Sequence, residues 1–243
     1  MSSYNTFAFF YDDLTQNVDY EVRSDYISDF FCRLGVESGK ILDLACGTGS
    51  VSMCLHNKGY DVTGIDLSSD MLTIADSKSN GKIKLIQGDM TDFCTNECYD
   101  GCVCSLDSIN HLVSIEDVKK CFKCVKNALK PNGVFVFDVN TIYKHNHILG
   151  DNSFVFDEEN YFLSWDNENV GDNSVRILLD FFVFNGTSYD RYSEEFYEKA
   201  YSIDEIVSVL DGFEIIDIFD DLTFDKPKDD SERLYFVCKR KDN

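Results

Sequence analysis

Small residues follow an acid directly in the stretch ILDLACGTGS, residues 41–50. Asp43 closes an apolar, strand-like run, and the chain continues with Ala45, Cys46, Gly47, Thr48 and Gly49. Glycine reaches backbone conformations that other residues avoid and carries no Cβ, so such a turn lets the main chain come close to a ligand. The function of the chain therefore depends on which ligand this turn binds.

Three glycine-rich patterns can be compared with the turn. A Walker phosphate loop requires GxxxxGK[ST], which is missing here, and a dinucleotide fingerprint requires GxGxxG, whose third glycine is replaced by Ser52. The third pattern is acid-x-G-x-G-x-G, which serves a methyl donor. It fits from Asp43 to Gly49, with Ala45 in place of the first glycine.

Two further acids stand where later strands are expected to end. Asp66 follows Gly49 by 17 residues and suits a ribose, whose hydroxyls can donate to a carboxylate. This alone does not separate NAD from S-adenosylmethionine. Asp89, in QGDM, can accept from the exocyclic amine of adenine while a neighbouring backbone N–H meets a ring nitrogen. One such acid is often only a turn former, but three in register favour a nucleoside ligand.

Helical and strand-like segments alternate around these residues. A helix is expected within 18–36, and strands at 40–46, 60–67, 82–89, 99–107 and 133–140. Helices are expected at 49–59, at 68–79 with Ser68 or Ser69 as N-cap, and at 114–133 with a capping box from Ser114 to Asp117. This alternation predicts a parallel sheet covered on both faces, with ligands beyond the carboxyl ends of its strands.

The rhythm changes after residue 140. Strand-like runs at 153–165, 174–186 and 188–201, separated by turn signals, predict an antiparallel elaboration. A helix at 202–213 capped by Ser202 and a closing strand pair at 213–222 and 233–241 complete the chain.

Composition limits the class of protein. No run of about 18 apolar residues is present and no basic leader precedes the first apolar run, so we expect a cytoplasmic protein that does not bind a membrane. The net charge is −22, and residues 141–243 hold 24 acids against 10 bases, which disfavours nucleic acid as a partner. The ten cysteines lack paired CxxC knuckles, so we expect reduced thiols and no metal site.

The motifs LDLACGTGS, GIDLSSDML, QGDM, YDGCVCSLDSINHL and LKPNGVFVFDV occur in this order over residues 39–140. Together they resemble the class I S-adenosylmethionine-dependent methyltransferases. The resemblance implies an α/β fold with a doubly wound, Rossmann-like sheet of seven mostly parallel strands in the order 3-2-1-4-5-7-6, the last strand antiparallel. It also implies S-adenosylmethionine as cofactor and S-adenosylhomocysteine as product.

The same resemblance assigns residues to the donor, S-adenosylmethionine. The turn meets its methionine moiety, Asp66 its ribose, Leu67 its adenine face, and Asp89 with the Met90 backbone its adenine edge. Tyr11 and Tyr20 could close over it. The complete implied donor set is Tyr11, Tyr20, Asp43, Ala45, Cys46, Gly47, Gly49, Asp66, Leu67, Asp89, Met90 and Leu106.

The outer segments 7–20 and 191–216 resemble a narrower group, the bacterial small-molecule methyltransferases that include amino-sugar N,N-dimethyltransferases. This implies one domain, 1–243, with a helical lid (1–38), a donor-binding core (39–140), an antiparallel insert roofing the active site (141–201) and closing elements (202–243). It implies acceptor contacts from Asn110, His111, Glu195 and Tyr201. Relatives often have E-x-H-x-x-R-x-Y in the roof, whereas Tyr197 and Lys199 stand here, so the acceptor stays open.

Methyl transfer to an amine requires the nitrogen to lose a proton, and a group that titrates near neutrality serves best. His111 is therefore the candidate catalytic residue. The first hypothesis is a methyltransferase acting on a small molecule, most simply at an amine nitrogen, as a monomer or homodimer. The alternatives are methylation of a peptide amino terminus or another macromolecule, a non-catalytic S-adenosylmethionine-binding protein, and an NAD-dependent dehydrogenase supported by Gly47, Gly49 and Asp66.

Overall fold

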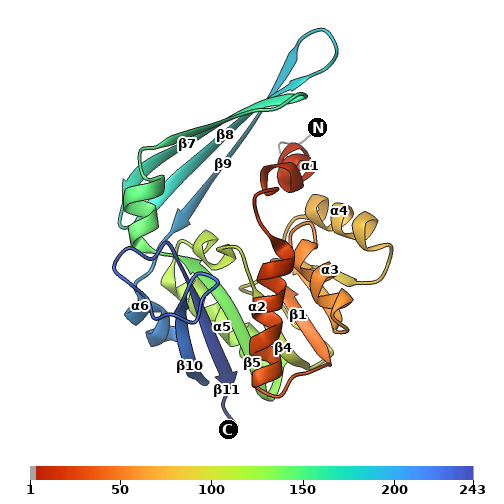
Figure 1. Ribbon diagram of the computed structural model, residues 1–243, viewed down its shortest axis with the longest axis vertical. Coiled ribbons are helices and arrows are strands. Elements are labelled where there is room, and N and C mark those ends of the chain that lie inside the picture. The colour runs from red at the N-terminus through yellow and green to blue at the C-terminus, as the bar shows by residue number, and fades with distance from the viewer. Residues whose placement is uncertain (1–3, 243) are drawn as a thin grey trace.

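The computed structural model describes residues 4–242, and its centre is a seven-stranded sheet in the order β10-β11-β5-β4-β1-β2-β3 (Figure 1). All neighbouring pairs are parallel except those of β11, which runs antiparallel to β5 and β10. Because β10 and β11 are the sixth and seventh strands of this sheet along the chain, the predicted order 3-2-1-4-5-7-6 is confirmed. Its strands are β1 (Lys40–Leu44), β2 (Asp61–Asp66), β3 (Lys84–Gln87), β4 (Tyr99–Cys104), β5 (Leu129–Asn140), β10 (Phe213–Asp220) and β11 (Arg233–Arg240).

Helices cover both faces of this sheet. One apolar layer joins it to α2 (Tyr20–Arg33) and α3 (Ser50–Asn57), and the other joins it to α5 (Ile115–Ala128) and α6 (Ile203–Val209). α4 (Ser69–Ser79) lies against β2 and β3. The central strands are buried on both sides, which explains why their sequences are almost continuously apolar. Within residues 4–242, no helix is long and apolar enough to cross a membrane.

The predicted caps of three helices can be compared with the observed hydrogen bonds. Ser68 caps α4 by accepting from the backbone N–H of Met71, as predicted, and Ser202 caps α6 with a full capping box. The predicted capping box of α5 is wrong, because the Ser114 side chain makes no cap hydrogen bond. The Asp117 carboxylate instead accepts from Lys120 Nζ at 2.7 Å, one turn further along the helix.

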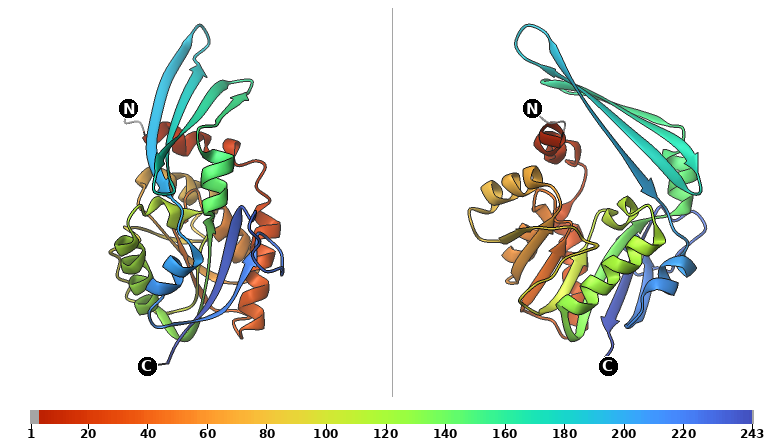
Figure 2. Two further views of the ribbon diagram at one scale, coloured as in Figure 1. Left: turned by 90° about the vertical axis from the view of Figure 1, so that its left-hand side faces the viewer. Right: turned by 180° about the vertical axis from the view of Figure 1, so that it is seen from behind.

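The insert forms a separate antiparallel sheet in the order β6-β7-β8-β9, which we call the roof (Figure 2). Its strands are β6 (Ser153–Asp157), β7 (Tyr161–Gly171), β8 (Ser174–Phe184) and β9 (Tyr189–Lys199), and a short helical segment, η2 (Lys144–Leu149), leads into it from β5. The predicted antiparallel insert is therefore present. Two neighbouring strands, β8 and β9, are paired along their whole length, which fixes the face to which each side chain points.

Helix α1 (Tyr4–Leu14) contacts both α4 and β9, and so joins the roof to the main sheet (Figures 1 and 2). Its Phe10 ring lies 4.7 Å from the ring of Tyr161 and 5.6 Å from that of Phe181. These residues belong to a third apolar cluster, which lies on the inner face of the roof. α1 thus covers an apolar surface that the roof would otherwise expose.

A buried ion-pair network holds the loop that follows β4. The Asp138 carboxylate, fully buried at the end of β5, accepts from the backbone N–H groups of Leu106 at 2.9 Å and Asp107 at 2.7 Å. Both residues have left-handed backbones, with φ of 58° and 52°. Arg233, at the start of β11, pairs with Asp138 and also donates to Asp107 Oδ1 at 2.6 Å. The network therefore fixes a strained loop against two strands.

Replacing Arg233 by methionine should lower the free energy of unfolding by about 3–5 kcal/mol, because the substitution removes the hydrogen-bonded counter-charge of the buried Asp138 and leaves, among the described residues, only Arg23, whose Nη1 lies 3.7 Å away. Urea titrations of the variant and the parent protein measure this difference. Arg191→Met is the matched control, since it breaks an exposed ion pair with Asp180 and should barely move the unfolding midpoint. Equal shifts in the two variants would contradict the importance of the buried network.

Candidate active site

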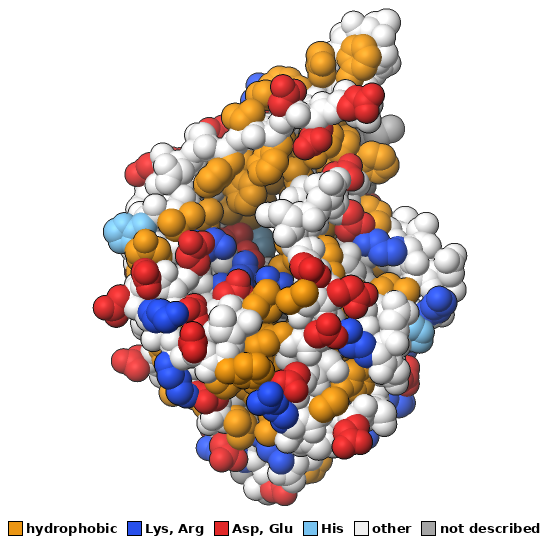
Figure 3. All heavy atoms as spheres, in the orientation of Figure 1, with side chains coloured by type: hydrophobic (Ala, Val, Ile, Leu, Met, Phe, Trp, Pro, Cys, Tyr) orange, Lys and Arg blue, Asp and Glu red, His pale blue; other side chains and the backbone are white. Residues whose placement is uncertain are grey.

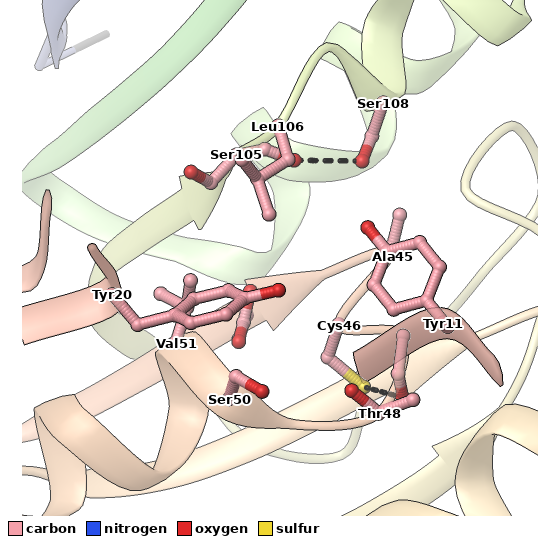
Figure 4. Close-up of a pocket in the computed structure, with 12 residues that line it drawn as sticks. Tyr11, Tyr20, Ala45, Cys46, Thr48, Ser50, Val51, Ser105, Leu106 and Ser108 are labelled. Carbon is pink, nitrogen blue, oxygen red and sulfur yellow. Dashed lines mark hydrogen bonds between the residues drawn. The ribbon is translucent and has the colours of Figure 1, made fainter. Parts of the chain in front are cut away.

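A small cavity lies at the carboxyl end of β1, between the glycine turn and the loop after β4 (Figure 4). The rings of Tyr11 and Tyr20 stand on two sides of it. Seven residues of the predicted donor set line it: Tyr11, Tyr20, Asp43, Ala45, Cys46, Gly47 and Leu106. Thr48, Ser50, Val51, Ser105 and Ser108 also line it and were not predicted.

Three residues with left-handed backbone conformations shape the glycine turn. Ala45, Gly47 and Gly49 have φ of 57°, 53° and 76°. A Cβ on Gly47 would meet nothing within 4 Å, so this backbone faces open space, whereas a Cβ on Gly49 would lie 3.1 Å from the Cβ of Ala75 in α4. Gly47 therefore leaves room for a ligand, and Gly49 allows α3 and α4 to approach each other.

Two predicted acids hold the turn in place. Asp66 accepts from the backbone N–H of Gly47 and from that of Ser68, both at 2.8 Å, and so connects the ends of β1 and β2. Asp43 lies deeper and accepts from Ser52 Oγ at 2.5 Å. Burial raises the pKa of Asp43 to about 7 and also raises the pKa of Asp66.

The residues predicted for the adenine end lie outside the cavity. Leu67, directly after β2, is 68% exposed, and Met90 is half-buried against the core. Asp89 accepts from the backbone N–H and the hydroxyl of Thr91, at 2.7 and 2.8 Å. These contacts orient Asp89 at the end of β3, which pairs with the end of β2 at Asp66.

Helix α1 closes the cavity through an acid that sequence reasoning missed. Asp12 accepts from Thr48 Oγ1 at 2.6 Å and pairs with Lys78 Nζ of α4, also at 2.6 Å. With Tyr11 in place, the cavity measures only about 30 Å³. These two contacts of Asp12 hold α1 over the glycine turn. The first acid in YDD, directly after the predicted Tyr11, was the available signal.

A buried carboxylate lies between two imidazoles on the acceptor side. Glu198, at the end of β9, has its two oxygens 3.7 Å from His111 Nε2 and 3.7 Å from His145 Nε2. The His111 side chain is 44% exposed, and its ring lies 5.2 Å from that of Phe196. His145 is fully buried, and its Nδ1 lies 3.0 Å from the carbonyl oxygen of Asn173. Glu198 and His145 were not predicted.

Three predicted acceptor residues are engaged elsewhere. Glu195 is on the outer face of the roof, where both its oxygens accept from Arg176 at 2.9 and 3.0 Å. The Asn110 amide is buried and bonds the backbone at Asn140 and Lys199, and the buried Tyr201 hydroxyl bonds the carbonyl of Leu112. Side chains alternate along a strand, so the inward glutamates of β9 are Glu194 and Glu198.

Neighbouring charges give Glu198 and Asp107 very different pKa values. Burial, followed by the charge of Asp107, raises the pKa of Glu198 to about 7. Burial would raise the pKa of Asp107 too, but Arg233 and Lys144 lower it to about 2. No lysine or arginine of the described residues lines the cavity at the glycine turn. Asp43 beside the cavity and Asp66 behind the glycine turn make this region acidic, which suits a cationic ligand such as S-adenosylmethionine.

Comparison with known proteins supports this fit. The family model described as "Methyltransferase domain" matches residues 41–133. YqeM of Bacillus subtilis, whose name marks it as an inferred methyltransferase, is 35% identical over 98% of this chain and 97% of its own. The chain belongs to the S-adenosylmethionine-dependent methyltransferases. A methyltransferase of this kind from Clostridium acetobutylicum has a solved structure, with 35% identity, a TM-score of 0.89, and coverage of 99% of this chain and 100% of that one.

The names of two more distant relatives state what kind of acceptor each methylates. A dTDP-3-amino-3,4,6-trideoxy-alpha-D-glucopyranose N,N-dimethyltransferase of Streptomyces venezuelae is 31% identical over 51% of this chain and 52% of its own. The sugar N-methyltransferase KedS8 of Streptoalloteichus has a TM-score of 0.81 at 20% identity, covering 96% of this chain and 92% of its own. At this identity the second likeness shows a common fold.

Removing the Asp66 carboxylate should abolish donor binding. S-adenosylmethionine and S-adenosylhomocysteine should raise the melting temperature of the parent protein in a saturable way, and Asp66→Ala should lose this shift because both the ribose partner and the Gly47 contact are gone. Asp61→Ala, at the opposite, exposed end of β2, is the control and should keep it. Stabilisation by NAD alone would contradict the donor assignment.

The raised pKa of Glu198 predicts a pH dependence of stability. Its folded pKa of about 7 exceeds the unfolded value of about 4.3, so its stabilising contribution is complete below pH 4.3 and is lost as the pH rises through 7. The parent should therefore lose stability relative to Glu198→Gln between these values, by up to about 3 kcal/mol. Urea midpoints at pH 5, 6, 7 and 8 measure the difference. A difference that is flat with pH would refute the prediction.

Proposed function

We propose that this methyltransferase methylates an amine nitrogen of a small molecule in the hollow beneath the roof. The observation that carries the proposal is the buried Glu198 carboxylate beside His111. A carboxylate shielded from water attracts a cation far more strongly than an exposed one does. In Figure 3, acidic, basic and histidine side chains meet at the floor of this hollow, under the hydrophobic side chains of the roof.

The residues of the chain can bind the amine and take its proton. An aliphatic amine arrives as an ammonium ion, which Glu198 and Asp107 attract. Glu198, with a pKa of about 7, is partly ionised at neutral pH and can accept the proton, and the half-exposed His111 can pass it to solvent. The freed lone pair is then the nucleophile. The donor would supply a methyl group on a sulfonium: the methyl–sulfur bond breaks as the N–C bond forms, its electron pair stays on sulfur, and S-adenosylhomocysteine is released.

Closure by α1 and the roof supports a small acceptor. Phe7 of α1 lies 6.2 Å from Phe196 of β9, ring to ring, so these aromatic side chains cover the side of the hollow away from the main sheet. The name of the Streptomyces venezuelae relative, an N,N-dimethyltransferase of an amino sugar, agrees with nitrogen as the methylated atom. A carboxylate beside an imidazole suits a cationic acceptor better than a neutral hydroxyl.

A screen of primary amines, with release of S-adenosylhomocysteine as the readout, tests this function. Glu198→Gln should lower kcat at least tenfold at pH 7, because the amide can neither attract the ammonium nor accept its proton. Donor binding should be unchanged. Glu195→Gln, three residues earlier and on the outer face, is the control and should retain full activity. Amine turnover that is equal in the two variants would rule out Glu198, and no turnover of any amine would rule out the proposed acceptor class.

A further inference from the structure

A second glutamate of β9, Glu194, lies on the inner face of the roof and plays no part in the chemistry above. The residue is 9% exposed, and its Oε1 is buried without a hydrogen-bond partner. No described residue forms an ion pair or a hydrogen bond with it. The other buried acids near the site have polar neighbours: Asp43 accepts from Ser52, Asp138 pairs with Arg233, and Glu198 lies 3.7 Å from the Nε2 atoms of His111 and His145.

The surroundings of Glu194 are apolar and aromatic. Directly opposite, on β8, is the buried Leu179, and Tyr192 and Phe196 flank Glu194 on the same face of β9. Burial raises the pKa of Glu194, and no positive neighbour lowers it. A carboxyl group in such a place destabilises the protein unless something pairs with it. Aromatic faces and a buried carboxylate together are the chemistry that binds an ammonium ion.

Glu194 and Glu198 share one strand and one face. They are four residues apart, which separates their Cα atoms by about 13 Å at the rise of a β-strand. Phe196 lies between them on this face, with its ring 5.2 Å from that of His111 and 6.2 Å from that of Phe7. The inner face of β9 therefore presents acid, aromatic ring and acid in line.

We propose that Glu194 binds a second cationic group of the acceptor, so that the acceptor is an extended diamine or polyamine. One amine reaches Glu198 and His111, where it is methylated, and the chain of methylene groups lies along Phe196 to Glu194. The proposal rests on the proposed function, because it places the reacting nitrogen at Glu198. The outer face of the same strand cannot serve in this way, since Arg176 already occupies Glu195.

Calorimetric titration of the full chain, saturated with S-adenosylhomocysteine, tests the second subsite. The probes are spermidine, 1,4-diaminobutane and 1-aminobutane. The parent protein should bind spermidine at least tenfold more tightly than 1-aminobutane, with 1,4-diaminobutane between them. Glu194→Gln should remove most of this preference and leave the affinity for 1-aminobutane unchanged. Glu195→Gln removes the same formal charge from the other face and should keep the preference, which controls for the general attraction of cations to an acidic protein.

The outcomes separate the two proposals. A spermidine preference that survives in Glu194→Gln, or that is lost equally in both variants, overturns the second subsite while amine methylation stands. Equal affinity of the parent for all three probes also overturns the second subsite and leaves amine methylation standing. If the parent binds none of the probes, and the amine screen also finds no turnover, the proposed function fails and the inference fails with it.

Discussion

The buried Asp138 carboxylate is the constraint on which the acceptor side of the site depends. It holds two backbone N–H groups of the loop after β4 and is neutralised by Arg233 from β11. This loop needs two successive non-glycine residues in the left-handed region, Leu106 and Asp107, which is unfavourable in isolation. The ion pair stabilises that conformation. It thereby sets the position of Asp107, which helps to raise the pKa of Glu198 across the hollow.

Helix α1 couples the donor side to the acceptor side. Its Asp12 and Tyr11 side chains reach the glycine turn and the cavity, and its Phe7 and Phe10 rings pack against the roof. A helix of 11 residues is marginal by itself, so its stability comes from these tertiary contacts. Helix α1 therefore packs on the glycine turn and on the aromatic face of the roof at the same time.

The acids of the site differ from most acids of this negatively charged chain in how far they are exposed to water. A net charge of −22 attracts cations in general, but most of these acids lie in water and are screened. Glu198 and Glu194 differ because the roof and α1 keep water from them. A carboxylate buried in this way interacts with a nearby charge more strongly than a screened surface carboxylate does.

The sequence by itself determined the donor half of the protein. The glycine turn and the strand-end acids depend on local spacing, and the parallel sheet depends on the repeating pattern of strand and helix, so these predictions needed no knowledge of distant contacts. The strand order was implied by the resemblance of the motifs to a known family, and the strand pairing confirms it. Ser202 with Glu205 illustrates the same rule at a helix start. Ser114 with Asp117 is the exception, because a lysine one turn away competes for the same carboxylate.

Only the tertiary structure decided the acceptor half. Glu194 and Glu195 are adjacent, and which of them turns inward depends on the pairing of β9 with β8, because a shift of one residue exchanges the two faces. His145 was not predicted, and Asn110 was predicted to contact the acceptor. The first becomes a neighbour of Glu198, and the second holds the backbone of β5 and β9, only when η2, β5 and β9 meet. Long-range packing sets these roles, so the residues adjacent in the sequence do not reveal them.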